Sequence, residues 1–166
     1  GLVVIEDCAQ APGAPYTGRR VGSIGHIGAW SFCQDKIMTT GGEGGMVTTS
    51  DETLWRSMWS YKDHGKSYEA IYEKKHPPGF RWVHEGFGSN FRMIEIQATI
   101  GLIQLKRMSE WNAKRNANTI NILKAFEPFK AIRISHFKCN ENCLNDCASL
   151  SQCKHAQYKC YVYVDN

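Results

Sequence analysis

The hydrophobic positions near the start of the chain form one short continuous run, and two further apolar runs follow before residue 50. The first run, Leu2 to Ile5, is rich in β-branched residues and ends at Glu6-Asp7. Such a run is typical of a strand buried on both faces of a parallel sheet. Ile27 to Phe32 and Gly45 to Thr49 indicate a second and a third strand, and Cys8 to Ala14 a short helical turn. The pattern predicts an α/β fold.

Two helices are predicted from capping residues and from helical periodicity. Ser50-Asp51 can cap a helix that runs through Trp59 and ends near His64-Gly65, where glycine suits the position after a helix. Ile94 to Leu105 is apolar almost all round, as expected for a helix buried on several sides. Lys106 to Phe126 mixes apolar and charged residues instead. Together these two stretches predict one long helix that leaves the main domain.

The remaining segments are less regular. Lys66 to Ser89 has no clean periodicity, contains Pro77-Pro78 and carries several aromatic residues. It predicts a long loop that is either a functional lid or a flexible excursion. After Phe126, the alternation of Lys159 to Val164 indicates a strand of a second unit. We therefore predict two domains, residues 1–125 and residues 126–166.

Charge and hydropathy exclude some classes of function. The net charge of +4 and the pI near 8.7 are only mildly basic, and the lysines and arginines are spread along the chain. This distribution argues against a nucleic-acid partner. No apolar stretch approaches the roughly 20 residues that cross a bilayer, and the N-terminal run is unlike a signal peptide. We expect a cytoplasmic protein with no membrane partner.

Seven cysteines are present, and four of them lie close together near the C-terminus. These are Cys139, Cys143, Cys147 and Cys153, flanked by His136 and His155. Their spacing does not match the paired CxxC pattern of structural zinc sites. Three of them, spaced by four, could line one face of a short helix as free thiols. The pattern favours reduced, non-ligating thiols over a bound metal, and we predict no metal site.

Candidate chemistry lies where the predicted strands end. Asp7 follows the first strand, and Lys36 comes 29 residues later, shortly before the glycine-rich turn Gly41 to Gly45. Open α/β sheets bind ligands at the carboxyl ends of their strands. A lysine there could form a Schiff base with a carbonyl cofactor such as pyridoxal phosphate, with the carboxylate facing the pyridinium nitrogen. Two solvated surface residues are the alternative that spacing alone leaves open.

The sequence around this pair resembles, in order, the DegT/DnrJ/StrS family of sugar aminotransferases. The similar stretches are VIEDCAQAPGAPYTGRRVGSIGHIGAWSF, Lys36 with GEGGMV, KDHGK, GSNFRMIEIQATIGLIQL and, more loosely, KHAQYKCYVYV. The resemblance implies an aspartate-aminotransferase-like fold (fold type I), with a three-layer α/β/α large domain. Residues 1–125 would be the C-terminal part of that cofactor-binding domain, and residues 126–166 the beginning of a small C-terminal α/β domain.

The same resemblance implies roles for five residues. Lys36 would hold pyridoxal phosphate as a Schiff base and move a proton when freed, and Asp7 would keep the ring nitrogen protonated. Gln10 would lie against the cofactor ring, and Ser31 would hydrogen-bond its phosphate. Asn90 would reach the partner subunit's cofactor phosphate, which implies a homodimer with shared sites. A surface amide and a backbone-bonded hydroxyl are the alternatives for Gln10 and Ser31.

Four further residues are weaker candidates for the substrate site. Arg92 would contact the phosphates of a nucleotide sugar, or else serve as a structural arginine at the sheet. His64, His155 and Tyr158 are candidate lining residues, although histidines in loops are more often surface groups that form hydrogen bonds. The turn has two glycines before Glu43 where the family usually has one, which puts the substrate preference in doubt more than the Schiff base.

The resemblance also implies a reaction. It is the transfer of an amino group from glutamate or glutamine to a keto sugar nucleotide, in the synthesis of amino sugars for surface polysaccharides or secondary metabolites. A sugar 3-dehydratase of the same family is a second enzymatic alternative, although those relatives carry histidine where this chain has Lys36. A non-catalytic truncated domain, or a metal-binding protein built on the cysteines, is the alternative from a different class. Because the chain starts without Met and is shorter than family members, we expect an internal fragment.

Overall fold

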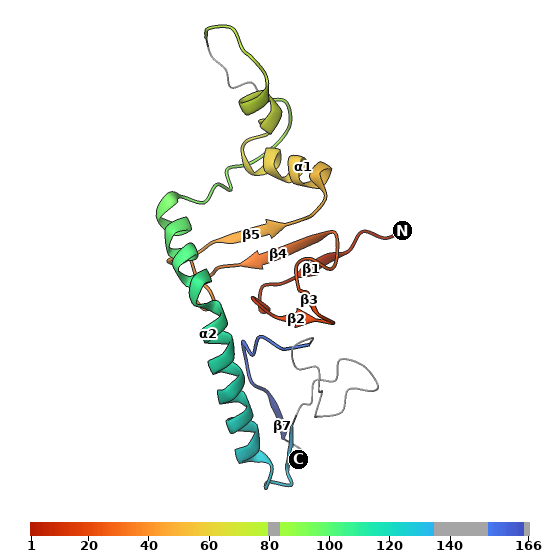
Figure 1. The fold of residues 1–166 in the computed structure, drawn as a ribbon, viewed down its shortest axis with the longest axis vertical. Coiled ribbons are helices and arrows are strands. Elements are labelled where there is room, and N and C mark those ends of the chain that lie inside the picture. The colour runs from red at the N-terminus through yellow and green to blue at the C-terminus, as the bar shows by residue number, and fades with distance from the viewer. Residues whose placement is uncertain (80–83, 135–152, 165–166) are drawn as a thin grey trace.

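A three-stranded mixed sheet forms the centre of the structure, a computed structural model that describes residues 1–79, 84–134 and 153–164. β1 (Ile5–Asp7) pairs in parallel with β4 (Ile27–Ser31), and β4 pairs antiparallel with β5 (Gly45–Thr48). The strand order is β1-β4-β5 (Figure 1). The second and third predicted strands are confirmed to within one residue, and the sheet and its helices confirm an α/β fold.

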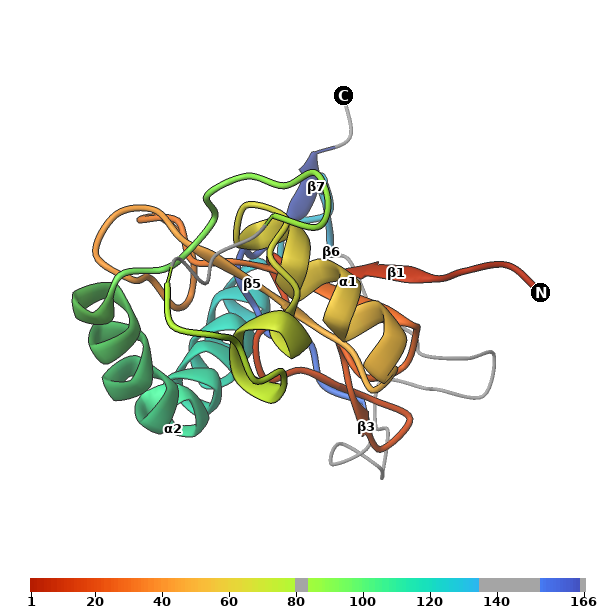
Figure 2. The ribbon, with the colours of Figure 1, turned by 90° about the horizontal axis from the view of Figure 1, so that it is seen from above.

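The first predicted strand is displaced, and its expected burial is wrong. Pairing begins at Ile5, opposite Ile27, so Leu2 to Val4 precede the ladder. Leu2 is 90% exposed and Ile5 is 64% exposed. Figure 2 shows this N-terminal stretch extending away from the rest of the ribbon. An apolar run is buried on both faces only where layers cover both sides of a sheet. Within the described residues, these apolar side chains have no such cover.

Glu6 anchors β1 to the loop that precedes β4. Its carboxylate accepts hydrogen bonds from the backbone N–H groups of Gly22, Ile24 and Gly25, each at 2.7 Å. Burial by itself raises the pKa of Glu6. The three N–H donors and the charge of Arg19 act in the opposite direction, and the net result is a pKa below the ordinary value. The carboxylate therefore stabilises the fold in its ionised form.

Replacing Glu6 with glutamine is expected to lower the free energy of unfolding by about 1–3 kcal/mol, because at least one buried N–H group loses its acceptor. The folded-state pKa is lowered, so the contribution is present above the ordinary value of 4.5 and is lost as the pH falls through the folded-state pKa. Urea unfolding of the gene product that carries this chain, at several pH values, measures both effects. Glu110→Gln, at an exposed helical position, is the control. An equal loss in the two variants would contradict the assignment.

The segment between β1 and β4 forms tight turns and a small hairpin. Ala11 N–H donates to the Cys8 carbonyl and Ala14 N–H to the Ala11 carbonyl. The helical turn predicted over Cys8 to Ala14 is therefore two successive turns. Pro12 has no N–H to continue a helix, and Gly13 adopts a φ of 76°. The hairpin β2 (Pro15–Tyr16) and β3 (Arg19–Arg20) follows.

α1 (Glu52–Lys62) begins at the predicted cap. The Asp51 carboxylate accepts a hydrogen bond from the Leu54 N–H at 2.9 Å. The helix ends at Lys62, slightly before the predicted His64-Gly65. These two residues have φ values of 60° and 78°, the left-handed conformation that terminates helices. An added Cβ at Gly65 would lie 1.8 Å from the Gly86 carbonyl oxygen, so this turn requires glycine.

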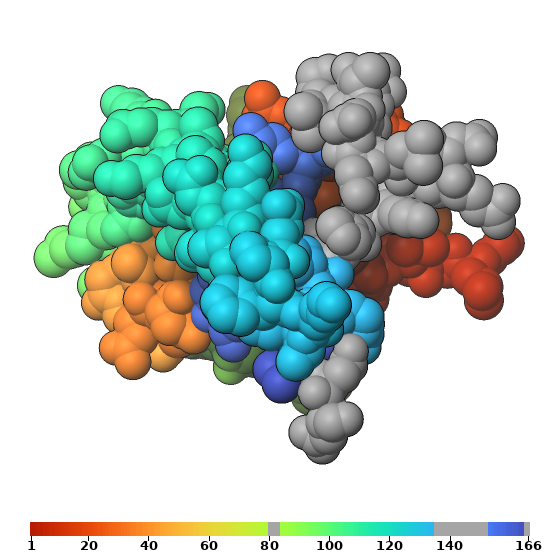
Figure 3. Space-filling model, turned by 90° about the horizontal axis from the view of Figure 1, so that it is seen from below, coloured from red at the N-terminus to blue at the C-terminus, as the bar shows by residue number. Residues whose placement is uncertain are grey.

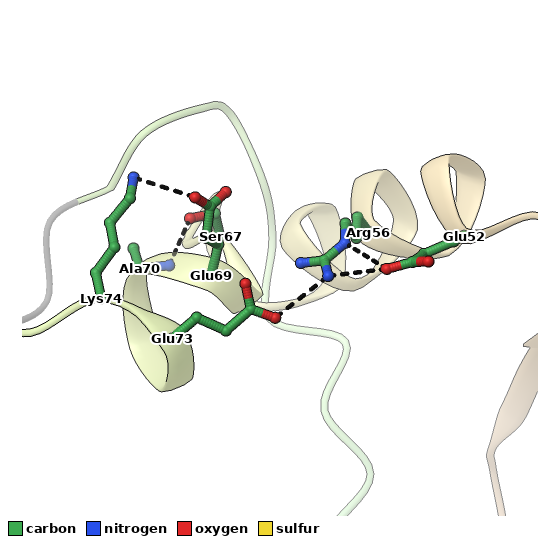
Figure 4. A network of polar contacts seen from close by, with 7 residues as sticks. All are labelled: Glu52, Arg56, Ser67, Glu69, Ala70, Glu73 and Lys74. Carbon is green, nitrogen blue, oxygen red and sulfur yellow. Dashed lines mark hydrogen bonds and ion pairs between the residues drawn. The ribbon is translucent and has the colours of Figure 1, made fainter.

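The segment after α1 has more structure than the predicted loop. It contains η1 (Glu69–Glu73), a single turn of π-helix. Four aromatic side chains make edge-to-face contacts between α1 and this segment: Trp55, Trp59, Tyr68 and Tyr72. The Arg56 guanidinium bridges Glu52 at 2.8 Å and Glu73 at 3.2 Å (Figure 4). The described part is thus packed on α1, whereas residues 80–83 lie outside the described residues.

α2 (Glu95–Phe126) confirms the long helix and runs along one side of the molecule (Figure 1). At its N-terminal end, the Gln97 side chain donates to the Glu43 carbonyl at 2.7 Å, and Gln104 accepts from the Thr39 N–H at 2.8 Å. These contacts join the helix to the glycine-rich turn. The expected burial on several sides is wrong, because Leu102 is 61% exposed. In the described chain only one face of this half is packed.

The C-terminal half of α2 lies beside the C-terminal segment (Figure 3). The Asn116 side chain donates to the His155 carbonyl at 3.2 Å. Beyond the helix, β6 (Ile132–Ile134) pairs antiparallel with β7 (Val162–Val164), which confirms the end of the strand predicted at Lys159 to Val164. The hydrophobic core contains residues of the N-terminal segment, the turn that follows β4, α2 and the C-terminal segment. They are Ala14, Phe32, Ile37, Met38, Met108 and Ala156. None of the described helices is long and apolar enough to cross a membrane.

Candidate functional site

Asp7 and Ser31 lie on the same face of the sheet, at the carboxyl ends of neighbouring parallel strands. The register places Asp7 opposite Ala29, and Ser31 follows two residues later on β4. Side chains of paired residues, and of residues two apart, point to the same face. The opposite face carries Glu6 and Trp30. The sheet therefore presents a carboxylate and a hydroxyl at the edge where α/β sheets bind ligands.

The turn that carries Lys36 is fixed at both ends by backbone hydrogen bonds. The Phe32 N–H donates to the Gly44 carbonyl at 2.8 Å, and the Thr40 N–H donates to the Phe32 carbonyl at 3.2 Å. Thr40 is only 1% exposed, and its hydroxyl donates to the Glu43 carbonyl at 3.1 Å. Ile37 and Met38 are also buried in the core. Packing on these neighbours holds the backbone of Lys36 in place.

The glycine-rich turn reverses the chain between β4 and β5. Gly41 and Gly42 have φ values of 82° and 136°, which side-chain-bearing residues rarely adopt. An added Cβ at Gly42 would meet no atom within 4 Å. The second glycine before Glu43 is thus required by backbone conformation and leaves open space beside the turn. The glycines of this turn therefore act through their backbone conformation.

The Lys36 ammonium lies beside the Asp35 carboxylate and the Tyr158 ring. The Lys36 side chain is 17% exposed, and its Nζ lies 3.9 Å from Asp35 Oδ1 and 5.1 Å from the centre of the Tyr158 ring. The Tyr158 hydroxyl donates to Asp35 Oδ2 at 2.9 Å. This hydrogen bond lowers the pKa of Asp35 and raises the pKa of Tyr158. Of the weaker candidates in the sequence, Tyr158 is the one that the structure brings to Lys36.

Gln10 is exposed and lies within the turn from Cys8 to Ala11. The segment after Asp7 forms separate turns and no continuous helix. The Asp7 side chain accepts a hydrogen bond from the Ala9 N–H at 3.0 Å. A cofactor role for Gln10 stays a prediction.

A second group of candidate residues lies where α1 ends and α2 approaches. Asp63 and Asn90 form an isolated antiparallel bridge. The Arg92 side chain donates to Asn90 Oδ1 at 3.1 Å and lies 3.4 Å from His64 Nε2 and 3.6 Å from Asp63 Oδ1. The KDHGK and SNFR motifs, separated along the chain, therefore meet in space. None of the contacts within the described chain joins Asn90 to Lys36.

Sequence reasoning missed Asp35 and Asp63. Asp35 precedes Lys36 directly, but its partner Tyr158 lies 123 residues further along the chain. Asp63 is only 8% exposed and forms ion pairs with Lys62 and Arg92, both at 3.6 Å. The KDHGK motif did contain a signal for Asp63. An acidic residue at a helix C-terminus is unfavourable for the helix itself, so its presence there indicates another role.

Most of the cysteine cluster falls outside the described residues. Cys139, Cys143 and Cys147, with His136, belong to the undescribed stretch. Cys153 is described, and its sulfur accepts a hydrogen bond from the Thr17 N–H at 3.1 Å. His155 uses its Nδ1 to accept from the Gln157 N–H at 3.0 Å. Among residues 1–79, 84–134 and 153–164, no three His, Cys, Asp or Glu side chains are grouped as metal ligands would be.

The sheet thus carries a carboxylate at the end of one parallel strand and, after the neighbouring strand, a lysine and a glycine turn. Open α/β sheets bind ligands at this edge. The sequence matches the profile of the DegT/DnrJ/EryC1/StrS aminotransferase family over residues 1–163. The chain belongs to this family.

Relatives and solved structures agree with this placement. The chain is 43% identical to GDP-perosamine synthase of Caulobacter vibrioides over 114 residues, which are 69% of the chain and 28% of that protein. It is 40% identical over 129 residues to L-glutamine:2-deoxy-scyllo-inosose aminotransferase of Streptoalloteichus tenebrarius, covering 75% of the chain and 30% of that protein. Its fold matches the aminotransferase of Psychrobacter cryohalolentis with a TM-score of 0.88 and 61% identity, covering 98% of the chain and 40% of that structure.

The fold is accordingly that of the fold-type-I aminotransferases, as the sequence resemblance implied. The chain spans less than half the length of the relatives and structures it matches.

Proposed function

We propose that the gene product carrying this chain is a pyridoxal-phosphate-dependent aminotransferase. It transfers an amino group from glutamate or glutamine to a keto sugar nucleotide, in the synthesis of an amino sugar for a surface polysaccharide. The observation that carries the proposal is the placement of Lys36. In a member of this aminotransferase family, a largely buried lysine stands on a rigid turn directly after the strand that neighbours Asp7.

The residues present fit the cofactor. Lys36 supplies an amine that can bond covalently to an aldehyde, and Asp7 supplies a carboxylate for a protonated ring nitrogen. The Ser31 oxygen accepts a hydrogen bond from the Cys33 N–H at 3.4 Å, and its own proton can be donated to a phosphate. When bound, pyridoxal phosphate would supply the electron sink for transamination.

Each of these residues then has a defined role. Lys36 would hold the cofactor and, once freed, move a proton. Asp7 would keep the ring nitrogen protonated by a charge-assisted hydrogen bond. Gln10 would lie against the ring, and Ser31 and the partner subunit's Asn90 would bind the phosphate. Residues 1–125 would belong to the large cofactor domain and residues 126–166 to the small domain, with the enzyme acting in the cytoplasm.

The names of two relatives support the proposed substrate class and amino donor. One relative is named for a GDP-linked sugar product and another for glutamine as the donor. The presence of Lys36 argues against the 3-dehydratase alternative, whose members carry histidine at this position. The metal-binding alternative rests on cysteines outside the described residues, and no observation on the described chain favours it.

An isotope-transfer assay tests this function. The purified gene product is incubated with pyridoxal phosphate, keto sugar nucleotides and glutamate or glutamine labelled with ¹⁵N at the α-amino group. We expect ¹⁵N to appear in the sugar nucleotide by mass spectrometry, and only with the cofactor present. Loss of a hydroxyl group without gain of nitrogen would instead show a dehydratase. No change in any sugar nucleotide, with the cofactor bound, would contradict the proposal.

Subunit complementation tests the shared site. Lys36→Ala and Asn90→Ala are each expected to be inactive, and mixing them under subunit exchange should restore part of the activity. In a mixed dimer one site receives Lys36 from one chain and Asn90 from the other. The other site lacks both residues.

Two outcomes would contradict the shared-site assignment. One is that Asn90→Ala alone is active. The other is that mixing restores nothing although exchange is demonstrated with differently tagged subunits. Asn90 would then be a structural residue that positions Arg92, in line with its hydrogen bond to the Arg92 side chain. Ser89→Ala, next in the chain, is the matched control and should stay active without a partner.

A further inference from the structure

Lys36, Asp35 and Tyr158 form a closed triangle of contacts. The Lys36 ammonium lies 3.9 Å from one carboxylate oxygen of Asp35. The other oxygen accepts the Tyr158 hydroxyl at 2.9 Å. The Tyr158 ring in turn faces the ammonium, with 5.1 Å between Nζ and the ring centre. A cation beside both a carboxylate and an aromatic face satisfies two separate electrostatic preferences.

The position of Tyr158 is set by packing that does not involve Lys36. Ala156, two residues earlier, is 2% exposed and belongs to the core. The Lys154 N–H donates to the Pro15 carbonyl at 3.0 Å. Gln157 adopts a φ of 53°, so the chain turns sharply just before the tyrosine. The C-terminal segment is therefore anchored independently, and it carries its aromatic ring to the lysine turn.

The two contacts that hold Lys36 in this triangle, at 3.9 Å to Asp35 and 5.1 Å to the Tyr158 ring centre, are both long. The Asp35 side chain is 62% exposed, so its ion pair with Lys36 is open to water on the Asp35 side. An ion pair with an exposed carboxylate at this distance is screened by water. The raised pKa of Tyr158 and the lowered pKa of Asp35 keep the hydroxyl as donor and the carboxylate as acceptor at neutral pH. The arrangement can hold a lysine and release it again.

We propose that Asp35 and Tyr158 are positioning residues that form a resting site for the Lys36 ammonium whenever Lys36 is not bonded to the cofactor. The inference rests on the proposed function for the identity of that cofactor. Asp35 and Tyr158 would keep the free Lys36 ammonium close to the position in which it bonds to the cofactor. Because Tyr158 belongs to the C-terminal segment, the position of the free Lys36 ammonium would depend on whether residues 153–158 are docked.

The test measures how fast an amine reagent modifies Lys36 in the cofactor-free gene product. Wild type, Asp35→Asn, Tyr158→Phe and Tyr158→Leu are pulsed with an acetylating reagent, and the Lys36 peptide is quantified by mass spectrometry. We expect Asp35→Asn and Tyr158→Leu to raise the labelling rate of Lys36 by about two- to fivefold, as expected for loss of an exposed ion pair or cation–π contact. Tyr158→Phe keeps the ring but loses the hydroxyl, and should give a smaller rise.

Lys62 is the internal control. It has the same two kinds of partner, with Asp63 at 3.6 Å and the Trp59 ring centre at 4.6 Å, but lies at the end of α1. Its labelling rate should not change in any variant. If Lys36 labelling is unchanged in Asp35→Asn and Tyr158→Phe, the proposal is wrong. A parallel rise at Lys62 would also overturn it, because it would show general loosening of the fold.

Thermal unfolding separates positioning from packing. Tyr158→Phe preserves the packed ring and should unfold at the wild-type temperature while its Lys36 labelling rises. A lower unfolding temperature with unchanged labelling would make Tyr158 a packing residue only. Since no cofactor is present, the labelling result does not depend on the proposed reaction. Faster labelling combined with failure of ¹⁵N transfer would uphold the resting site and reject the aminotransferase proposal.

Discussion

Replacing Lys36 with alanine is expected to reduce amine transfer by at least about 10⁴-fold, because the variant loses both the covalent anchor and the proton carrier. The turn that carries Lys36 is held by backbone hydrogen bonds from Phe32 and Thr40, and Ile37 and Met38 are buried in the core. The substitution should therefore remove the amine and leave the turn in place. Turnover of the sugar nucleotide, followed by mass spectrometry, measures the effect.

The matched control is Lys62→Ala. Lys62 also pairs with a neighbouring aspartate and an aromatic ring, so the substitution removes similar contacts away from the sheet edge. We expect it to keep most of the activity. A Lys36→Ala variant that retains more than a few per cent of wild-type turnover would remove Lys36 from the reaction. Equal losses in the two variants would point to a general effect on folding.

Asp7→Asn is expected to reduce amine transfer by about 10²- to 10³-fold, the cost typical of removing one charged partner from a developing charge. Asparagine keeps the size of the side chain and the oxygen that accepts the Ala9 N–H at 3.0 Å. The local turn should therefore survive, and the variant should still bind pyridoxal phosphate through Lys36. Single-turnover measurements with the amino donor separate the chemical step from cofactor binding.

Asp7→Glu is the companion variant, because it keeps the charge and shifts its position. It should be less impaired than Asp7→Asn if the charge is what matters. Near wild-type turnover in Asp7→Asn would exclude the carboxylate from the proposed mechanism. Loss of cofactor binding in the same variant would instead assign Asp7 a structural role at the end of β1.

Local patterns in the sequence predicted much of the fold. Three predicted features depend on residues near one another in the chain. They are the helix cap at Asp51, the strands around Ala29 and Val47, and the continuous helix through Met108. These signals come from capping and periodicity, and they work because the interactions are local. Asp7 and Ser31 were likewise placed by motifs on adjacent strands, and the register puts them on one face.

Features that depend on distant partners were not predictable. The exposure of Leu2 depends on which layers cover the sheet, and the run of apolar residues does not contain that information. The Glu6 carboxylate accepts hydrogen bonds from backbone N–H groups of a loop that begins 16 residues later, at Gly22. The contact between Asp35 and Tyr158 spans 123 residues. Pairs at such separation leave no periodic signal in a single sequence, so their meeting is a result of the fold.

The most direct test of the central claim is borohydride trapping of the gene product with pyridoxal phosphate. Borohydride converts a reversible lysine–cofactor bond into a stable one, and peptide mass spectrometry then identifies the lysine that carries the cofactor. We expect a single adduct, on Lys36, that is absent from the Lys36→Ala variant. An adduct on a different lysine, or none although the cofactor is bound, would contradict that claim.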